Sequence, residues 1–254
     1  MKYGAIYPSL KGRTVLVTGG GSGIGESIVE HFAAQGSKVA FIDIKEHESK
    51  ALVARLRRKR QKVHFEPCDL TDIAALRKAI ASVRKTFGPI TVLVNNAAHD
   101  ERHKLDDVTP EYFDDRIAVN LKHQFFAIQA VVGDMKKAKN GSIVNIGSNS
   151  WMIAHGGLPV YAAAKAGVLG LTRGVARELG KFNVRVNHVA PGWILTPRQL
   201  ELWATPAALE KLMQDQCLHR QLKGDDIARA VLFFASDEAS AATNQTFVFD
   251  GGWL

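Results

Sequence analysis

The sequence predicts an α/β fold, with one doubly wound domain built around a seven-stranded parallel sheet. Short apolar runs alternate with longer segments of helical periodicity along the whole chain, and a glycine-rich turn follows the first run. Strands buried on both faces of a parallel sheet are near-continuous apolar runs, and helices connect them. No linker, repeat or charge block divides the chain. Residues 1–254 are therefore expected to form one domain, although a chain of this length can also hold two.

The elements can be assigned in order. Expected strands lie at residues 14–18, 38–42, 90–94, 142–146, 184–189 and 246–249, and residues 62–66 are a weaker candidate for a seventh. Helical patterns follow Gly25 and occupy residues 46–60, 114–137 and 160–180. Thr109-Pro110 and Thr205-Pro206 each place a capping hydroxyl before a proline at the first helical position. Residues 193–222 interrupt the alternation and are expected to form a small lid over the substrate.

Composition excludes several classes of protein. Hydrophobic residues make up 46% and charged residues 23% of the chain, a balance that excludes disordered and collagen-like proteins. No apolar run approaches the ~18 residues that cross a bilayer, and the first residues lack the apolar stretch of a secretory signal. The chain is thus expected to be soluble, cytoplasmic and without a membrane partner. Cys68 and Cys217 match no metal-ligand spacing, so no metal site is expected.

The net charge of +8 is compatible with nucleic acid, an anionic membrane surface or an anionic small molecule as partner. The densest basic run lies at residues 55–62 and closes a predicted helix, where cations complement the negative end of the helix dipole. No aromatic residues interleave with these cations, as a platform for single-stranded nucleic acid requires. We interpret the run as a solvated helix terminus and expect no nucleic-acid partner.

The first expected strand runs into the sequence T-G-G-G-S-G-I-G at residues 18–25, and a helical pattern follows at once. Glycines allow a tight turn and a close approach of the backbone to a pyrophosphate. The amides at the start of the helix then face that anion. The spacing G-x-x-x-G-x-G differs from the commoner G-x-G-x-x-G fingerprint, but its place between a strand and a helix is the one that a dinucleotide site requires.

Asp43 closes the second expected strand, 24 positions after Gly19. A carboxylate at this place accepts hydrogen bonds from the adenosine ribose and repels the 2′-phosphate of NADP. Asp43 therefore favours NAD as the cofactor. A surface-turn aspartate is the alternative reading. Lys38 and Lys45 lie nearby and could weaken the discrimination.

Tyr161 and Lys165 lie four residues apart in the expected helix over residues 160–180, so their side chains share one face. A phenol titrates near ~10, which is too high for a base at neutral pH. A neighbouring ammonium stabilises the phenolate and lowers its pKa. The pair is therefore a candidate acid/base unit whose tyrosine is expected to have a lowered pKa.

With these features the chain resembles the short-chain dehydrogenase/reductase family over essentially its whole length. Further matching motifs are Asn95-Asn96-Ala97-Ala98 after the fourth strand, Asn120 in a helix, Ser148 at 13 positions before Tyr161, and Pro191-Gly192 before Thr196. The resemblance implies a Rossmann fold, dehydrogenase activity on CH–OH groups and NAD as cofactor. It also implies a homotetramer built through long helices and the C-terminal strand. The helix over residues 114–137 has apolar positions on more than one face, as partner contacts require.

The resemblance further implies roles for single residues. Tyr161 would be the base or acid for the substrate hydroxyl, and Ser148 would orient the substrate oxygen. Lys165 would hold the nicotinamide ribose and lower the pKa of Tyr161, while Asn120 would organise a proton relay through water. Asp69 would contact the adenine. The implied cofactor residues are Gly19, Ser22, Gly23, Ile24, Gly25, Asp43, Ile44, Asp69, Leu70, Asn96, Ala97, Ala98, Tyr161, Lys165, Pro191, Gly192, Ile194 and Thr196.

Within the family the chain is most similar to bacterial NAD-dependent sugar dehydrogenases of the xylose-type aldose 1-dehydrogenase branch, in residues 5–12, 100–105 and 216–218. The loops expected around the substrate mix polar groups for sugar hydroxyls with aromatic faces, although the tryptophans are equally explained by packing. The candidates are Asn149, Trp151, His155, Trp193, Arg198, Gln199 and Trp203. His99, His103 and His155 either contact the substrate or are ordinary surface histidines.

The leading hypothesis is the NAD-linked oxidation of an aldose, a pentose or a 6-deoxyhexose, at C1 to its lactone. The alternative is a dehydrogenase for a secondary hydroxyl of a 2-keto-3-deoxy sugar acid, because Arg198 could pair with a carboxylate. An alternative of another class is a non-catalytic regulator that binds a dinucleotide. Intact Ser148, Tyr161 and Lys165 argue against this last reading, because a sensor does not need a proton-transfer set.

Overall fold

Seven parallel strands form the centre of the computed structural model, which describes residues 4–254. The first three residues of the domain expected over residues 1–254 lie outside the described part. The strands are β1 (Thr14–Thr18), β2 (Lys38–Asp43), β3 (Lys62–Pro67), β4 (Val92–Asn95), β5 (Gly141–Ile146), β6 (Val184–Pro191) and β7 (Thr246–Phe249). Their order in the sheet is β3-β2-β1-β4-β5-β6-β7, and every neighbouring pair is parallel. The predicted fold class is confirmed, and β3 shows that the weaker candidate is a strand.

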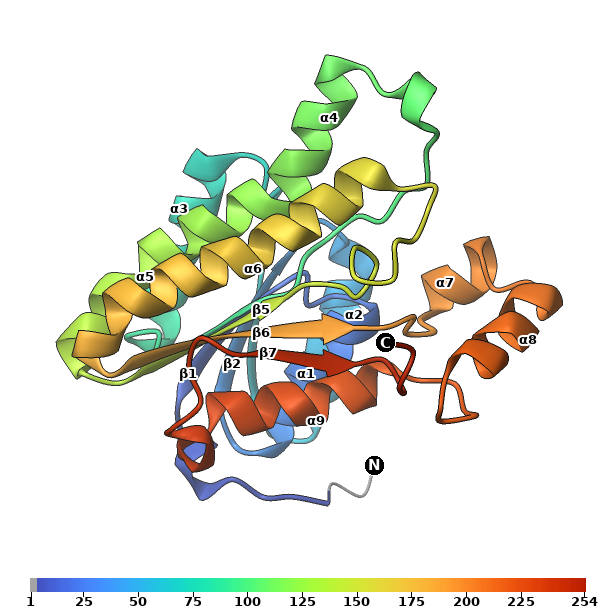
Figure 1. The fold of residues 1–254 in the computed structure, drawn as a ribbon. Coiled ribbons are helices and arrows are strands. Elements are labelled where there is room, and N and C mark those ends of the chain that lie inside the picture. Colours follow the sequence, from blue (N-terminus) through green and yellow to red (C-terminus); the bar gives the residue numbers. More distant parts are fainter. Residues whose placement is uncertain (1–3) are drawn as a thin grey trace.

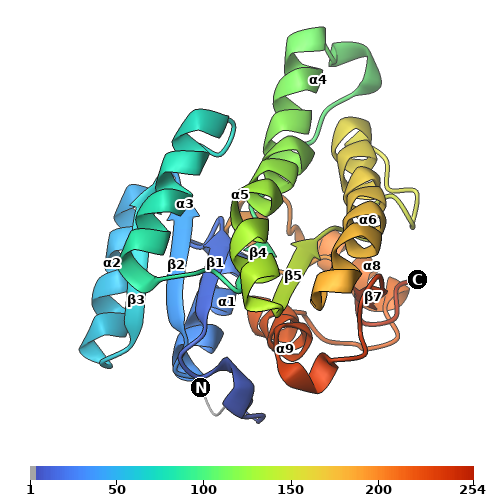
Figure 2. The ribbon, with the colours of Figure 1, turned by 90° about the vertical axis from the view of Figure 1, so that its left-hand side faces the viewer.

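Helices cover both faces of the sheet (Figures 1 and 2). One face packs against α1 (Gly23–Ala34), α2 (Glu46–Arg58) and α9 (Gly224–Ala235). The other face packs against α3 (Ile73–Phe87), α5 (His123–Ala138) and α6 (Pro159–Leu179). Single turns of 3-10 helix lie at Pro8–Leu10, Leu105–Asp107, Gly180–Phe182 and Asp237–Ala239.

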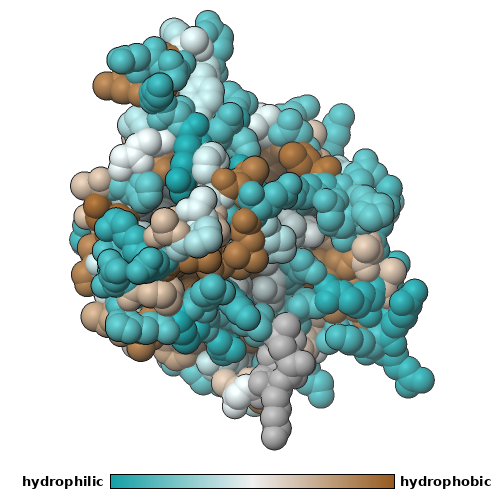
Figure 3. Space-filling model, turned by 90° about the vertical axis from the view of Figure 1, so that its right-hand side faces the viewer, coloured by the Kyte–Doolittle hydropathy of each residue, from teal (hydrophilic) through white to brown (hydrophobic). Residues whose placement is uncertain are grey.

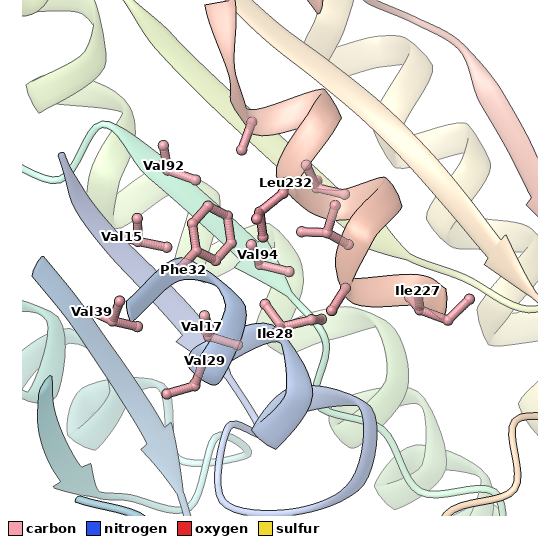
Figure 4. Close-up of a cluster of buried hydrophobic side chains, with 14 of the residues drawn as sticks. Val15, Val17, Ile28, Val29, Phe32, Val39, Val92, Val94, Ile227 and Leu232 are labelled. Carbon is pink, nitrogen blue, oxygen red and sulfur yellow. The ribbon is translucent and has the colours of Figure 1, made fainter. Parts of the chain in front are cut away.

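The core below α1 shows why the strands are continuously apolar. Val15 and Val17 of β1 point to the face that α1 covers, and Leu16 between them points to the other face. In Figure 4, Phe32 of α1 lies among side chains of β1, β4 and α9. Full burial of each such side chain stabilises the fold by ~1.5–3 kcal/mol relative to leaving it in water. Both faces of the sheet therefore need apolar residues at successive positions.

The helix predicted over residues 114–137 is divided in the structure. It consists of α4 (Pro110–Ile117), a π-helical turn at Ala118–Lys122 and α5. Thr109 caps α4 as predicted, because its hydroxyl accepts a hydrogen bond from the backbone N–H of Tyr112. A π-helical turn adds one residue to the helical turn and is frequent at functional sites. The apolar period of the segment does not reveal it.

The predicted insertion over residues 193–222 contains α7 (Pro197–Leu202) and α8 (Pro206–Asp215). Its two ends meet where Ile194 and Leu222 form an isolated parallel bridge. Figure 1 shows α7 and α8 beyond the arrowheads of β6 and β7, at the carboxyl ends of the strands. Within residues 4–254 no helix is both long and apolar enough to cross a membrane.

Candidate functional site

A cavity of about 1740 Å³ lies at the carboxyl ends of the strands. Residues that follow β1 to β6 line it together with α7 and α8. The sheet order places the change of winding direction between β1 and β4, and ligands of open α/β sheets bind at such a point. This end of the molecule is the side that faces the viewer in Figure 3, where hydrophobic patches lie between hydrophilic side chains.

The glycine loop is shaped by packing within the protein itself. Gly19 has a φ of +67°, and a Cβ atom there would lie 2.7 Å from the Cα atom of Ala97. A Cβ atom on Gly25 would lie 1.8 Å from the carbonyl oxygen of Gly19, so the start of α1 touches the end of β1. Ser22, at the N-cap, makes no side-chain hydrogen bond to the helix. The first-turn N–H groups of α1 therefore suit an anion such as a pyrophosphate.

Asn96 and Thr18 hold this loop against the end of β4. The Asn96 side-chain amide donates to the carbonyl oxygens of Thr18 and Gly19, at 3.1 and 2.9 Å. The Thr18 hydroxyl accepts from the backbone N–H groups of Asn96 and Ala97, at 3.0 and 3.2 Å. Asn96 thus lines the cavity, as the family resemblance implies, while its side chain is committed to the loop.

Asp43 ends β2 with a buried carboxylate beside the glycine loop. Its oxygens accept hydrogen bonds from the backbone N–H groups of Gly21 and Lys45, at 2.7 and 2.9 Å. A carboxylate has about four lone-pair positions, so Asp43 can still accept hydrogen bonds from a ligand. All of the residues predicted to bind the cofactor line this same cavity. The cavity, the anion-binding helix start and the Asp43 carboxylate together fit a dinucleotide.

Ser148, Tyr161 and Lys165 come together at the other end of the cavity. The hydroxyl groups of Ser148 and Tyr161 are hydrogen-bonded, and the Ser148 hydroxyl also accepts from the backbone N–H of Ser150 at 3.1 Å. The Lys165 ammonium donates to the Ile146 carbonyl oxygen at 2.9 Å and lies 5.6 Å from the centre of the Tyr161 ring. Lys165 is only 1% exposed. β5 and α6 thus supply three of the four predicted catalytic residues to one site.

The predicted lowering of the Tyr161 pKa is wrong for this structure. Burial raises the pKa of Tyr161 above its ordinary value, the Asp100 carboxylate raises it further, and the Ser148 hydrogen bond only partly offsets them. Burial also lowers the pKa of Lys165 to about 8, against an opposing effect of Asp100. The phenolate loses its hydration in this environment, and the ammonium is directed to the Ile146 carbonyl.

Two buried histidines belong to the same region. The Nε2–H group of His123 donates to the Ala97 carbonyl oxygen at 3.2 Å, because a carbonyl oxygen can only accept. Neither ring nitrogen of His188 has a hydrogen-bond partner in the described part of the chain. Burial, and secondarily the Lys165 charge, lowers the pKa of each histidine to about 4. Both rings are therefore neutral at physiological pH.

Asn120 lies in the π-helical turn with its side chain fully buried. The side-chain amide donates to the carbonyl oxygens of His99 and Arg116, at 3.1 and 2.9 Å, and its oxygen accepts from the His99 N–H at 2.9 Å. Among the described residues, Asn120 does not line the cavity. Its side chain fixes the loop that follows β4.

Only some of the residues predicted to contact the substrate line the cavity. Asn149, His155, Trp193, Arg198 and Gln199 line the cavity, whereas Trp151 and Trp203 are not among its described lining residues. The Arg102 guanidinium lies over the Trp203 ring, 4.4 Å from its centre, which supports the interpretation that Trp203 has a packing role.

Asn149 and His103 have structural partners. The Asn149 side chain is buried and donates to the Asp250 carboxylate at 3.2 Å, which ties the loop after β5 to the C-terminal turn. The His103 ring contacts the Tyr112 hydroxyl through Nδ1 at 2.9 Å and accepts from the Val160 N–H through Nε2 at 3.3 Å. The side chains of Asn149 and His103 therefore already have hydrogen-bond partners within the protein. His99 does line the cavity, with its ring against Arg116.

Asp100 is the site residue that sequence reasoning did not identify. It lines the cavity, and its carboxylate affects the pKa values of both Tyr161 and Lys165. The sequence feature that could have identified Asp100 is a carboxylate in the loop that follows Asn95-Asn96-Ala97-Ala98, at the carboxyl end of a central strand. Such positions are where ligands bind in open α/β sheets.

Comparison with known proteins gives concordant matches. A family model described as "Enoyl-(Acyl carrier protein) reductase" matches residues 19–254. The chain is 45% identical to the "D-xylose 1-dehydrogenase" of Caulobacter vibrioides, over 98% of each chain. It is 44% identical to the "Probable galactose dehydrogenase" of Rhizobium meliloti, over 97% of this chain and 96% of that one. The solved structure of a short-chain type dehydrogenase/reductase from Mycobacterium ulcerans superposes with a TM-score of 0.92 at 28% identity, and covers 96% of this chain and 90% of its own.

The neutral histidines predict a loss of stability in acid. His188 has a folded-state pKa of about 4 against 6.5 for an ordinary histidine, so the unfolded chain binds more protons between these values. Stability is thus fully present above pH 6.5 and falls as the pH drops toward 4. Between pH 7 and pH 5 the wild type should lose about 2 kcal/mol more than His188→Leu in urea unfolding. An equal loss in both proteins contradicts the assignment, and exposed His219→Gln is the control.

Proposed function

The chain belongs to the short-chain dehydrogenase/reductase family, and from that premise we propose that it is an NAD-dependent aldose dehydrogenase. In this proposal it oxidises a pentose or a 6-deoxyhexose at C1 to the lactone. The observation that carries the proposal is that one cavity is lined by the glycine loop, by Ser148, Tyr161 and Lys165, and by polar residues of α7. The relatives named for D-xylose and galactose support an aldose as the substrate class.

The chain's own residues account for the proton. A bound nicotinamide dinucleotide supplies the acceptor for the hydride that leaves C1. Tyr161 takes the proton of the C1 hydroxyl, and Ser148, hydrogen-bonded to Tyr161, orients the same oxygen. Removal of a hydride from carbon and a proton from oxygen leaves the C=O group of the lactone, so the two-electron oxidation balances.

Tyr161 must be in its phenolate form to take that proton, and its raised pKa makes this phenolate a strong base. In this proposal Lys165 holds the nicotinamide ribose. Asn120 organises a proton relay through water, in addition to holding His99.

The proposed preference for NAD rests on the buried Asp43 carboxylate at the end of β2. A 2′-phosphate placed there would meet a like charge. Lys45, Arg55 and Arg58 line the same part of the cavity, and Arg55 is already paired with Glu26 and Glu30 at 2.5 and 2.6 Å. These cations would compensate a phosphate only once the Asp43 charge is removed.

We also propose a homotetramer that contacts its copies through the long helices and the edge strand β7. Phe125 of α5 is 49% exposed and packs against Phe126, and Phe113 of α4 is exposed as well. Large aromatic side chains on a helix surface are typical of protein interfaces. Val248 gives the outer strand β7 an exposed apolar residue.

A steady-state screen of free sugars and sugar acids with NAD tests the substrate class. Turnover of a pentose or 6-deoxyhexose with lactone formation is expected, and Tyr161→Phe should lower kcat by at least ~10³-fold because the proton acceptor is lost. NADH binding by fluorescence should be nearly unchanged in that variant. Turnover of sugar acids alone contradicts the proposal, and NADH binding without turnover of any sugar supports a regulator instead.

Replacing Asp43 tests the cofactor preference. In Asp43→Asn the charge is lost but an oxygen can still accept from the Gly21 N–H, so the ratio of kcat/KM for NADP to that for NAD should rise at least ~10-fold. Asp69→Asn is the same chemical change after β3 and should affect both cofactors alike. A wild-type enzyme that already prefers NADP rules out this role of Asp43.

The oligomer is tested by light scattering coupled to size exclusion. The wild type should have four times the chain mass of 27.8 kDa. Phe125→Glu should dissociate it, because burying an unpaired carboxylate at an interface is costly. Leu218→Glu changes another exposed apolar residue, outside the long helices, and should leave the assembly intact. A monomeric wild type refutes the proposal.

A further inference from the structure

A chain of hydrogen bonds crosses the substrate end of the cavity, from the segment after β6, through α7, to the loop after β4. The Trp193 indole N–H donates to the Gln199 side-chain oxygen at 2.7 Å, and the Gln199 amide nitrogen donates to the Asp100 carboxylate at 2.6 Å. An indole N–H can only donate. The orientation of the Gln199 amide is therefore determined by Trp193, and its N–H₂ group must face Asp100.

The Asp100 carboxylate receives a second partner from the insertion. A guanidinium nitrogen of Arg198 lies 3.5 Å from its Oδ1 atom. The Asp100 side chain is still 31% exposed and lines the cavity together with Ser148 and Tyr161. With Gln199 and Arg198 on two of about four lone-pair positions, the carboxylate keeps acceptor capacity toward the cavity.

Building on the proposed function, we propose that Asp100 is the residue that selects a neutral sugar. Its carboxylate accepts hydrogen bonds from ring hydroxyls of the aldose near C1, and it rejects substrates that carry a carboxylate of their own. Gln199 and Trp193 are positioning residues that hold this carboxylate at the cavity wall.

Hydrogen bonds from hydroxyls to an ionised carboxylate are short and about twice as strong as those between neutral groups, so Asp100 suits sugar hydroxyls. A substrate carboxylate would instead meet a like charge, and discrimination by such repulsion is a common source of specificity. Arg198, the cation that a sugar acid would require, already faces Asp100. The effect of Asp100 on the pKa values of Tyr161 and Lys165 places its field at the reacting end of the cavity.

A matched pair of substrates tests this selection: the aldose that the wild type oxidises and the uronic acid of the same configuration. Both present the same C1 group, and they differ by a carboxylate on C5, the carbon that the pyranose ring oxygen joins to C1. Asp100→Asn should lower kcat/KM for the aldose at least ~10-fold and shift the uronic acid/aldose ratio of kcat/KM by ~10-fold or more toward the acid. Arg198→Gln should shift the same ratio in the opposite direction, because the Asp100 charge loses its partner.

Glu101→Gln is the control, because it removes the same charge at the next position in the chain. The Glu101 side chain pairs with Arg116 and does not line the described cavity. The uronic acid/aldose ratio of kcat/KM of this variant should stay within twofold of the wild-type ratio. If Asp100→Asn and Arg198→Gln lower both substrates equally, Asp100 only fastens the insertion and the inference is overturned. If Asp100→Asn does not fold, the Arg198→Gln ratio decides alone. A wild type that oxidises no aldose overturns the proposed function itself.

Discussion

The junction between the ends of β1 and β4 is the interaction on which the site depends. The Thr18 hydroxyl and the Asn96 amide together make four hydrogen bonds across it. They hold the Gly19 carbonyl where the start of α1 packs directly on it, at Gly25. This close packing aims the first N–H groups of α1 into the cavity. Because the strands are parallel, all the following loops open at the same edge.

The loop after β4 connects this junction with the insertion that contains α7. It begins at Asn96, is held on both sides of His99 by the buried Asn120 amide, and then presents Asp100 to Gln199 and Arg198 of the insertion. Asn120 reaches that backbone from a π-helical turn. The irregular turn therefore helps to hold the loop that connects the glycine loop with Asp100.

Local patterns predicted much of the molecule. Every strand was placed to within two residues at each end, because burial on both faces leaves a continuous apolar run that the sequence displays. The residues predicted to bind the cofactor lie in motifs at strand ends, and they all line the cavity. Residues that contact the substrate were harder to predict. Asn149 and His103 are residue types that bind sugars, but in the structure their side chains are hydrogen-bonded to Asp250 and Tyr112.

The sequence alone determined the parallel α/β fold, the glycine loop, the position of Asp43 and the spacing of Ser148, Tyr161 and Lys165, since each depends on neighbours within a few residues or on a short motif. Only the tertiary structure decided that the pKa of Tyr161 is raised, that Trp151 is not among the described residues that line the cavity and that Asp100 meets Gln199. Burial and charge at a site depend on segments distant in the chain. Asp100 and Gln199 are 99 residues apart, and no local pattern records that they touch.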